Sequence, residues 1–313
     1  MGVAFVFPGQ ASQYVGMGVE FYRDFPEAAS VFKRADDAIS FSLSRLCFEG
    51  PVDELNKTAN TQPAVLTVSV ACMEVFKARG APVPLALAGH SLGEYTALVN
   101  AGALAFEDAV RLVRKRGQYM QEAVPLGEGG MAAVMGLSGD IVVDVCRRAS
   151  QSGVVEAVNL NCPGQVVVAG DIAGLNAVEP MLKEAGARRF VKLPVSAPFH
   201  SSLMVPAGKR LAEDLDRVRI IDPKIPVMAN ADADFVRTGS EVKESLIRQV
   251  YSPVRWEESM RRLVAYGITT FVEVGPGKVL SGLLKKISRE TVKCNVEDIA
   301  SLEKALALTR EVS

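Results

Sequence analysis

The stretch PLALAGHSLGEYTALVNAGAL, residues 84–104, passes from an apolar run through a serine between two glycines into a segment with the period of a helix. Its first part, LALAG (85–89), has the composition of a buried strand. Apolar side chains then recur at helical spacing, at Leu92, Tyr95, Leu98 and Val99. Gly102 offers a stop. The stretch therefore predicts a strand, a tight turn at Ser91 and a helix.

The turn carries a motif that is also known from enzymes. The spacing of Gly89, Ser91 and Gly93 matches the G-x-S-x-G nucleophile elbow, in which a sharp turn between strand and helix exposes a serine. Side chains at the two glycine positions would crowd such a turn. A five-residue pattern also occurs by chance, so the motif alone leaves two alternatives: a catalytic serine and an ordinary strand-to-helix turn.

The same alternation of strand and helix runs through the rest of the chain. Further short apolar runs are VAFVF (3–7), VVVAG (166–170) and FVEVG (271–275). They predict an α/β protein with a mostly parallel sheet. Between Pro125 and Pro194 the order is strand, helix, strand, strand, helix, strand, which is the ferredoxin-like βαββαβ pattern. We expect a large α/β-hydrolase-like catalytic domain (1–125 and 196–313) with a small inserted ferredoxin-like domain (126–195); one continuous sheet is the alternative.

The composition of the chain argues against several classes of function. The chain has 313 residues, 49% of them hydrophobic and 23% charged, as expected of a folded soluble protein. A net charge of −1 gives no broad attraction to nucleic acid or anionic lipid. The five scattered cysteines include no CxxC pair, so they predict neither a zinc site nor a disulfide framework. The start lacks the basic region of a signal peptide, and no apolar run approaches the ~20 residues of a membrane span. We expect a cytoplasmic protein that binds neither nucleic acid nor membrane.

A serine nucleophile needs a base, and histidine is the usual one because its pKa lies near neutral pH. The chain has two histidines. His90 adjoins Ser91, and neighbouring side chains on a sharp turn point in different directions, which leaves His200 as the base. His200 follows a predicted strand and precedes a helix opened by Ser201 or Ser202. Functional residues gather at such strand ends; a surface or capping histidine is the alternative.

The helix predicted from about Phe106 to Val124 carries a charge on its apolar face. That face consists of Ala109, Val110, Leu112, Val113, Gly117, Met120 and Val124. Arg116 falls inside it, and a buried guanidinium should be paired because it cannot lose its charge. Its partner could be a core carboxylate, from Glu94, Asp108 or Asp171. It could instead be the carboxylate of a substrate, which arginine binds with two parallel hydrogen bonds. The helical wheel alone slightly favours the core carboxylate.

Six blocks of the sequence, taken together, are familiar. They are FVFPGQASQ (5–13), GHSLGEYTAL (89–98), RGQYMQEA (116–123), NCPGQVVVAG (161–170), SAPFHSSLM (196–204) and EVGPGKVLSGL (273–283). In order and spacing they closely resemble the malonyl-CoA:acyl carrier protein transacylase family of fatty acid synthesis. The resemblance runs from residue 5 to about residue 285 and is far more specific than any single motif.

The resemblance implies roles for the residues that carry it. Ser91 would be the acylated nucleophile and His200 its general base. Arg116 would bind the malonyl carboxylate, which reverses the preference drawn from the helical wheel. The backbone N–H groups of Gln10 and Leu92 would form the oxyanion hole.

Further residues of the resemblance lie around this set. Gln249, in IRQVYSPVRW (247–256), would help to orient the histidine. Phe199 resembles the bulky residue of malonyl-selective members, and His90 would be a supporting neighbour in the elbow. Ala11 departs from the family, which often has glycine at this position, and so puts the geometry of the local turn in doubt.

The implied reaction moves a malonyl group from coenzyme A to the phosphopantetheine thiol of acyl carrier protein through a serine ester. One thioester replaces another, so we expect no metal or nucleotide cofactor, and malonyl-CoA enters only as substrate. The partners would be malonyl-CoA and acyl carrier protein, and we expect a monomer. Acyl carrier protein is generally acidic, so its docking patch should be basic. The candidates are Arg188, Arg189, Lys192, Lys209, Arg210, Lys285 and Lys286.

Two other classes of function compete with this hypothesis. An α/β-hydrolase esterase or thioesterase normally has an acid between serine and histidine in chain order and the histidine near its C-terminus. Here more than a third of the chain follows His200, and no HGGG-type loop is visible. A catalytically silent scaffold that binds carrier proteins is the other possibility, and the intact set of Ser91, His200 and Arg116 weighs against it.

Overall fold

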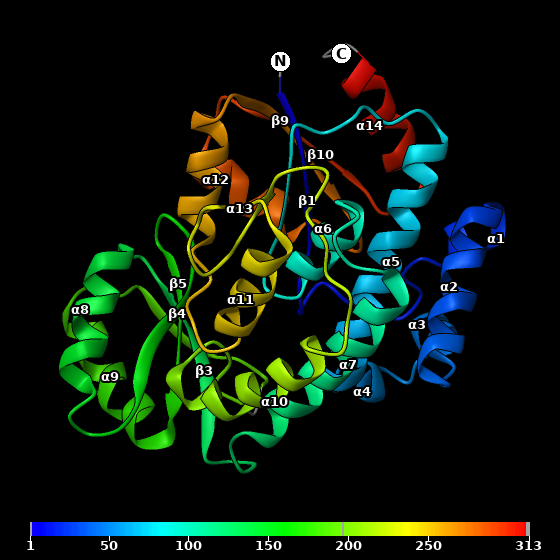
Figure 1. Ribbon diagram of the computed structural model, residues 1–313. Coiled ribbons are helices and arrows are strands. Elements are labelled where there is room, and N and C mark those ends of the chain that lie inside the picture. The colour runs from blue at the N-terminus through cyan, green and yellow to red at the C-terminus, as the bar shows by residue number, and fades with distance from the viewer. Residues whose placement is uncertain (1, 196, 311–313) are drawn as a thin grey trace.

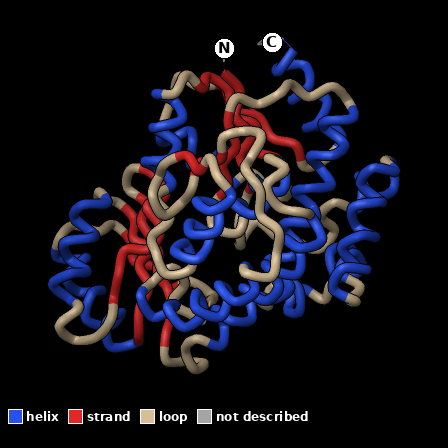
Figure 2. The backbone as a smooth tube through the Cα atoms, viewed as in Figure 1, coloured by secondary structure: helices blue, strands red, loops and turns tan. Residues whose placement is uncertain are grey.

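The computed structural model describes residues 2–195 and 197–310 and contains two separate sheets (Figures 1 and 2). The strands of the larger sheet are β1 (Gly2–Phe7), β2 (Ala86–Gly89), β7 (Val227–Met228), β8 (Phe235–Val236), β9 (Ile268–Val274) and β10 (Val292–Val296). Their order is β10-β9-β1-β2-β7-β8, and every neighbouring pair is parallel except β7 and β8. The predicted α/β class and the mostly parallel sheet are confirmed.

Helices cover both faces of this sheet, which is why its central strands β1 and β2 are apolar. Along β1, Phe5 and Phe7 face one core, while Ala4 and Val6 face another. The first core is closed by α1 (Val19–Asp24), α2 (Pro26–Ile39), α3 (Leu43–Glu49), α4 (Val52–Leu55), α5 (Thr58–Ala78), α6 (Gly93–Asn100), α7 (Phe106–Glu122), α10 (Val205–Leu215), α11 (Gly239–Gln249) and α14 (Ile299–Arg310). The second is closed by α12 (Trp256–Ala265) and α13 (Val279–Ile287).

The smaller sheet is antiparallel and has its own core. Its strands are β3 (Gly129–Met135), β4 (Val155–Cys162), β5 (Gln165–Asp171) and β6 (Arg189–Lys192), in the order β4-β5-β3-β6. Two helices, α8 (Gly139–Ala149) and α9 (Ile172–Glu184), pack against it around a separate apolar cluster. In Figure 1 this part of the chain, drawn in green, lies beside the larger sheet. The described strands therefore do not form one continuous sheet.

The segment before α10 differs from the prediction. We expected a helix opened by Ser201 or Ser202 directly after a strand, but β6 ends at Lys192 and a loop separates it from His200. A three-residue 3-10 turn, Ser202–Met204, then precedes α10. The Ser201 hydroxyl donates to the Pro198 carbonyl instead of capping the helix. Pro206, which has no N–H to cap, occupies the first turn of α10.

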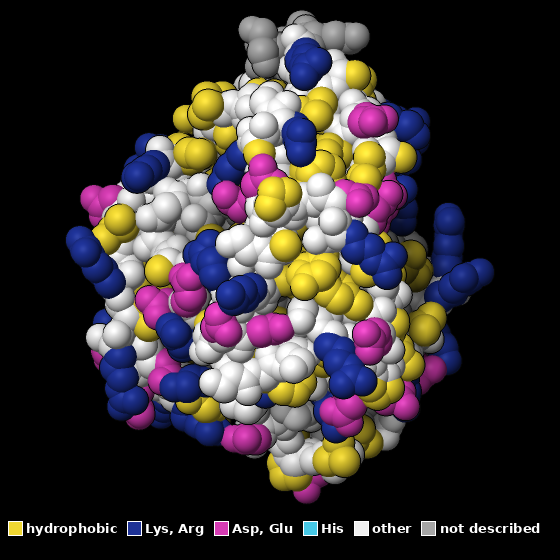
Figure 3. Space-filling view, turned by 90° about the vertical axis from the view of Figure 1, so that its right-hand side faces the viewer, with side chains coloured by type: hydrophobic (Ala, Val, Ile, Leu, Met, Phe, Trp, Pro, Cys, Tyr) yellow, Lys and Arg dark blue, Asp and Glu magenta, His cyan; other side chains and the backbone are white. Residues whose placement is uncertain are grey.

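The surface view in Figure 3 shows acidic and basic side chains intermingled, with no histidine among the described residues on that face. Over the described ranges, no helix combines the length and the apolar character that crossing a bilayer requires.

Candidate active site

Ser91 lies in the turn between β2 and α6, with a positive φ of 51°. Positive φ is unfavourable for a residue with a side chain, so the turn is held by its surroundings. The flanking glycines allow it: a Cβ on Gly89 would come within 1.9 Å of Gly93, and one on Gly93 would come within 2.1 Å of the Phe7 carbonyl oxygen. The predicted crowding is confirmed, and the turn presents the Ser91 hydroxyl at the carboxyl end of β2.

The Ser91 hydroxyl meets an imidazole. Ser91 Oγ lies 2.7 Å from His200 Nε2, and His200 Nδ1 lies 2.8 Å from the main-chain oxygen of Gln249. A carbonyl oxygen can only accept, so Nδ1 carries the proton and Nε2 is left free to accept from the serine. Burial, and after it the charge of Arg116, lowers the pKa of His200 to about 3. The imidazole is therefore neutral at neutral pH, as a base must be.

Arg116 is buried, as the helical wheel predicted, with 1% of its surface exposed. Its guanidinium donates to Gln62 Oε1 at 2.8 Å, Gln249 Oε1 at 2.9 Å and Ser91 Oγ at 3.2 Å. Among the described residues it forms no ion pair with a carboxylate, and its Nε–H has no hydrogen-bond partner. Its guanidinium also lies 5.7 Å from the centre of the Tyr95 ring. A buried cation whose hydrogen-bond acceptors are all neutral retains most of its attraction for an anion.

The carboxylates proposed as structural partners of Arg116 are otherwise occupied. Asp108 pairs with Arg111, and Asp171 caps α9 by accepting from the Gly174 N–H. Bridges from Arg116 to either are therefore wrong. Glu94 is buried close by but accepts from other donors, Asn230, Ser245 and Gln249.

The serine, the imidazole and the guanidinium open into one cavity of about 260 Å³. Gln10 lines it too, and Leu92 follows Ser91 at the start of α6. Within 2–195 and 197–310, neither the Gln10 nor the Leu92 backbone N–H donates to another protein group. Much of the remaining wall is apolar, with Met120, Met131, Val167, Leu193, Phe199, Leu280 and Leu283.

His90 points away from the serine. Its Nε2 lies 2.9 Å from Asn161 Oδ1, and its ring lies 5.5 Å from that of Trp256. The expectation that neighbouring side chains diverge on the turn is confirmed. Phe199, next to His200 in the chain, is buried with 7% exposure and forms part of the cavity wall.

The sequence interpretation missed Asn230. Its Oδ1 accepts from the Ser91 N–H at 2.6 Å, and its Nδ2 donates to the Gly89 carbonyl at 2.7 Å, so it clamps the turn on both sides of the serine. An isolated asparagine carries no motif. The available signal was its place two residues after the end of β7, the neighbour of β2, because the carboxyl ends of parallel strands meet at one edge of the sheet.

The turn that holds Gln10 contains a strained alanine. Ala11 has a φ of 78°, in the left-handed region that glycine adopts readily and alanine adopts only at a cost in free energy. The Ala11 N–H donates to Gln13 Oε1 at 2.8 Å, which holds the turn in place. The doubt raised by this departure is resolved: the turn forms, with backbone strain at residue 11.

Replacing Ala11 with glycine should relieve this strain. We expect Ala11→Gly to raise the free energy of unfolding by about 1 kcal/mol, as measured by urea denaturation. Ala81→Gly, in a loop where φ is not positive, is the control and should lower it slightly. A loss of stability in both variants would show that the strain at Ala11 is negligible.

No group of three or more His, Cys, Asp or Glu side chains within the described ranges is arranged to hold a metal ion. The five cysteines are free, and four of them are buried. The polar groups that the cavity offers include a hydroxyl, a neutral imidazole, a cation and backbone N–H groups.

Comparison with known proteins places this arrangement in a family. Residues 4–311 match the model of the acyl transferase domain. The malonyl CoA-acyl carrier protein transacylase of Bacillus subtilis is 49% identical over 310 residues, covering 99% of this chain and 98% of the relative. The crystal structure of an acyl-carrier-protein S-malonyltransferase from Burkholderia pseudomallei superposes with a TM-score of 0.96 at 50% identity, covering 98% of this chain and all of that one. A malonyl-transacylase solved in complex with its type II PKS acyl-carrier protein has a TM-score of 0.96 at 42% identity, over 98% of this chain and all of that one.

Proposed function

The chain belongs to the acyl transferase domain family, and from this premise we propose that Ser91 is its nucleophile and His200 its general base. The enzyme transfers a malonyl group from malonyl-CoA to the phosphopantetheine thiol of acyl carrier protein. One observation carries the assignment of residues: Ser91 Oγ lies between a neutral imidazole at 2.7 Å and a buried guanidinium at 3.2 Å, inside one cavity.

The first half-reaction loads the serine. His200 Nε2 takes the hydroxyl proton as Ser91 Oγ attacks the thioester carbon, and the C–O bond forms. The carbonyl oxygen becomes an oxyanion, which the N–H groups of Gln10 and Leu92 stabilise; losing one such donor typically costs about 3 kcal/mol. The C–S bond then breaks, and the departing thiolate takes the proton back from His200. Ser91 is left as a malonyl ester.

The second half-reaction repeats these steps with a different thiol. His200 deprotonates the phosphopantetheine thiol of acyl carrier protein, the thiolate attacks the Ser91 ester, and the serine oxygen leaves with the proton. The same two N–H groups serve the second oxyanion. Because coenzyme A departs before the carrier protein reacts, the kinetics should be ping-pong.

Arg116 gives the site its preference for malonyl. We assign its guanidinium to the free carboxylate of the malonyl group, through two parallel hydrogen bonds. The absence of an ion pair with Arg116 among the described residues supports this role, as does its unpartnered Nε–H. Phe199 would restrict the space beside the malonyl group, because it is buried in the same wall. Gln249 would hold His200 through its main-chain oxygen.

The two sheets correspond to a proposed division of the chain. Residues 1–125 and 196–313 would form the α/β-hydrolase-like catalytic domain, and residues 126–195 an inserted ferredoxin-like domain. The separate core and the strand order β4-β5-β3-β6 support this division. We also propose a cytoplasmic monomer that requires no metal or nucleotide cofactor.

A basic cavity lies next to the active site. Its lining includes Arg188, Arg189 and Lys286, and the Lys286 ammonium donates to Gln165, which also lines the active-site cavity. We propose that this cluster receives the acidic acyl carrier protein. Of the other basic candidates, Arg210 is paired with Glu122.

Reversing the charge of Arg189 tests the docking proposal. For Arg189→Glu we expect the KM for acyl carrier protein to rise about tenfold, because a like charge then faces the partner. Loading of Ser91 from malonyl-pantetheine, which has no nucleotide phosphates, should be unchanged. Arg148→Glu, an exposed charge on α8 outside both cavities, is the matched control. An equal rise in KM in both variants would mean that only net charge matters.

Incubation with malonyl-CoA alone separates transfer from hydrolysis. A transacylase holds a malonyl group on Ser91 until a thiol arrives, whereas an esterase or thioesterase releases free malonate to water. We expect a malonyl adduct by intact-mass spectrometry and its discharge on addition of acyl carrier protein. Rapid release of malonate with no transfer would overturn the proposed function, and no adduct at all would indicate a silent scaffold.

A further inference from the structure

Glu94 is a buried carboxylate to which the proposed mechanism gives no role. It lies on α6, three residues after the nucleophile, and 1% of its surface is exposed. Glu94 Oε2 accepts from the Asn230 N–H and from Gln249 Nε2, both at 2.8 Å, and Oε1 accepts from the Ser245 hydroxyl at 3.3 Å. A buried carboxylate is costly unless its oxygens are satisfied, and these donors satisfy both of them.

The contact with Gln249 determines which way that side-chain amide faces. A guanidinium only donates, so the Gln249 oxygen must face Arg116, and the NH2 group therefore faces Glu94, whose pKa is raised by burial to about 7. In that orientation Nε2 donates to Glu94 and to the Ser91 carbonyl at 3.0 Å, while Oε1 accepts from Arg116 Nη2 at 2.9 Å. If the amide were rotated by half a turn, its oxygen would face the Glu94 carboxyl group and its NH2 group would face the Arg116 guanidinium, and both hydrogen bonds would be lost.

Through these two partners Glu94 reaches all three groups of the site. The main-chain oxygen of Gln249 holds His200 Nδ1, and its side chain holds Arg116. The Asn230 side chain holds the backbone on both sides of the serine. Asn230 and Gln249 come from different parts of the fold, one after β7 and the other at the end of α11. Glu94 joins them with one oxygen atom.

We propose that Glu94 is a positioning residue for acyl transfer: it fixes the Gln249 amide and Asn230, and through them the orientation of Arg116, His200 and Ser91. The proposal rests on the roles assigned to those three residues above. It predicts that the length of the side chain at residue 94, which decides whether it can accept hydrogen bonds from both Asn230 and Gln249, matters more than its charge. This length should determine both the rate at which Ser91 is loaded and the preference for malonyl over acetyl.

Two conservative variants separate reach from charge. In Glu94→Gln the amide oxygen can accept from Asn230 and Gln249, while the NH2 can donate to the Ser245 hydroxyl, so every contact survives without the charge. Glu94→Asp keeps the charge but is one methylene shorter, so it cannot reach both donors. Glu94→Ala removes the contacts altogether and frees the Gln249 amide to turn.

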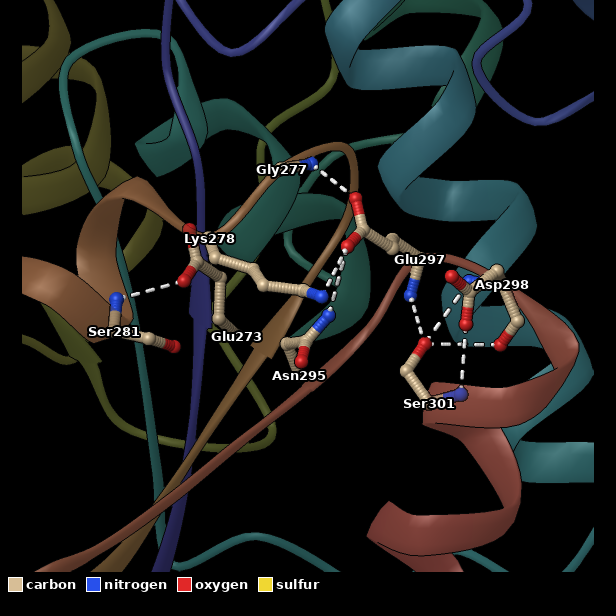
Figure 4. Close-up of polar contacts among 8 residues, drawn as sticks. All are labelled: Glu273, Gly277, Lys278, Ser281, Asn295, Glu297, Asp298 and Ser301. Atoms are coloured by element: carbon tan, nitrogen blue, oxygen red, sulfur yellow. Dashed lines mark hydrogen bonds and ion pairs between the residues drawn. The ribbon is translucent and has the colours of Figure 1, made fainter.

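Glu297 offers a matched control. Like Glu94, it accepts from one backbone N–H, of Gly277 at 2.8 Å, and from one side-chain amide, of Asn295 at 3.3 Å; Lys278 Nζ lies 3.1 Å away (Figure 4). Its side chain is 11% exposed, and Gly277, Asn295 and Lys278 form no hydrogen bond with the Ser91, His200 or Arg116 side chains. Glu297→Ala and Glu297→Gln therefore measure how much loading changes when a carboxylate with several polar partners is replaced away from the three groups of the site.

The experiment measures single-turnover loading of Ser91 from malonyl-CoA and from acetyl-CoA by intact mass, over a range of concentrations. For Glu94→Ala we expect kcat/KM for malonyl-CoA to fall about 100-fold, as for a small displacement of catalytic groups. The ratio of malonyl to acetyl loading should fall about tenfold, because malonyl also depends on Arg116. Glu94→Gln should stay within about threefold of the parent protein in both measures, since it keeps the hydrogen bonds. Neither Glu297 variant should change the ratio.

An unchanged malonyl-to-acetyl ratio in Glu94→Ala would overturn the positioning role, and so would loading by Glu94→Gln that is no faster than loading by Glu94→Asp. Should Glu94→Ala fail to fold, the comparison of Glu94→Gln with Glu94→Asp still decides. Loading of the parent protein distinguishes a failure of the proposed function from a failure of the role of Glu94. If it forms no malonyl adduct, the proposed function itself fails; if it does and the Glu94 variants behave like it, only the role of Glu94 fails.

Discussion

Replacing Ser91 with alanine should abolish the malonyl adduct and lower transfer to acyl carrier protein by a factor on the order of 10⁶, as losing a serine nucleophile does elsewhere. Alanine has no oxygen to take the acyl group, so His200 has no proton to remove. The measurements are intact mass after incubation with malonyl-CoA and the rate of malonyl transfer. Residual transfer would come only from binding and the oxyanion hole.

Ser69→Ala is the control for this substitution. Ser69 is fully buried in α5, and its hydroxyl has no hydrogen-bond partner among the described residues, so its loss should leave the adduct intact. A malonyl adduct of undiminished mass and yield on Ser91→Ala would place the acyl group on another residue and remove the basis for the mechanism.

The second large effect is expected at Arg116. Arg116→Ala should lower kcat/KM for malonyl-CoA by two to three orders of magnitude, roughly the 3–4 kcal/mol of a buried charge-assisted pair. Acetyl-CoA has no carboxylate for the guanidinium to bind, so acetyl transfer should suffer much less. Loading with both acyl-CoAs measures the difference directly.

Arg111→Ala is the matched control for Arg116→Ala, because Arg111 lies on the same helix but its contacts are with Asp108 and the Ala38 carbonyl. It should leave both acyl groups unaffected. Equal losses of malonyl and acetyl transfer in Arg116→Ala would indicate that the arginine only supports the structure around Ser91.

The strand-to-helix turn and the buried arginine could both be predicted from local pattern. The turn is predicted by the spacing of Gly89, Ser91 and Gly93, because it can form only where the two residues that flank the serine motif have no side chain. The burial of Arg116 follows from the period of a single helix. The outlines of β1, β2, β5 and β9 followed from short apolar runs in the same way.

The partners of these residues could not be predicted in that way. Arg116 is held by Gln62 from α5 and Gln249 from α11, and these contacts depend on how three helices pack. The helical wheel indicates that a partner is needed without saying which one, and so it suggested three carboxylates, none of which forms an ion pair with Arg116 among the described residues. Asn230 was missed for the same reason, because its role arises from the pairing of β7 with β2.

The support of His200 by the main-chain oxygen of Gln249 has a consequence for how this enzyme responds to mutation. Every substitution of residue 249 leaves a carbonyl in the chain, so no missense change deletes the acceptor itself. A conventional alanine scan would therefore report the loss of the Gln249 side chain and overlook the atom that holds the imidazole. In evolutionary terms, the acceptor for His200 Nδ1 depends on the backbone conformation at residue 249 and not on the type of side chain there. This hydrogen bond can therefore persist when residue 249 is substituted.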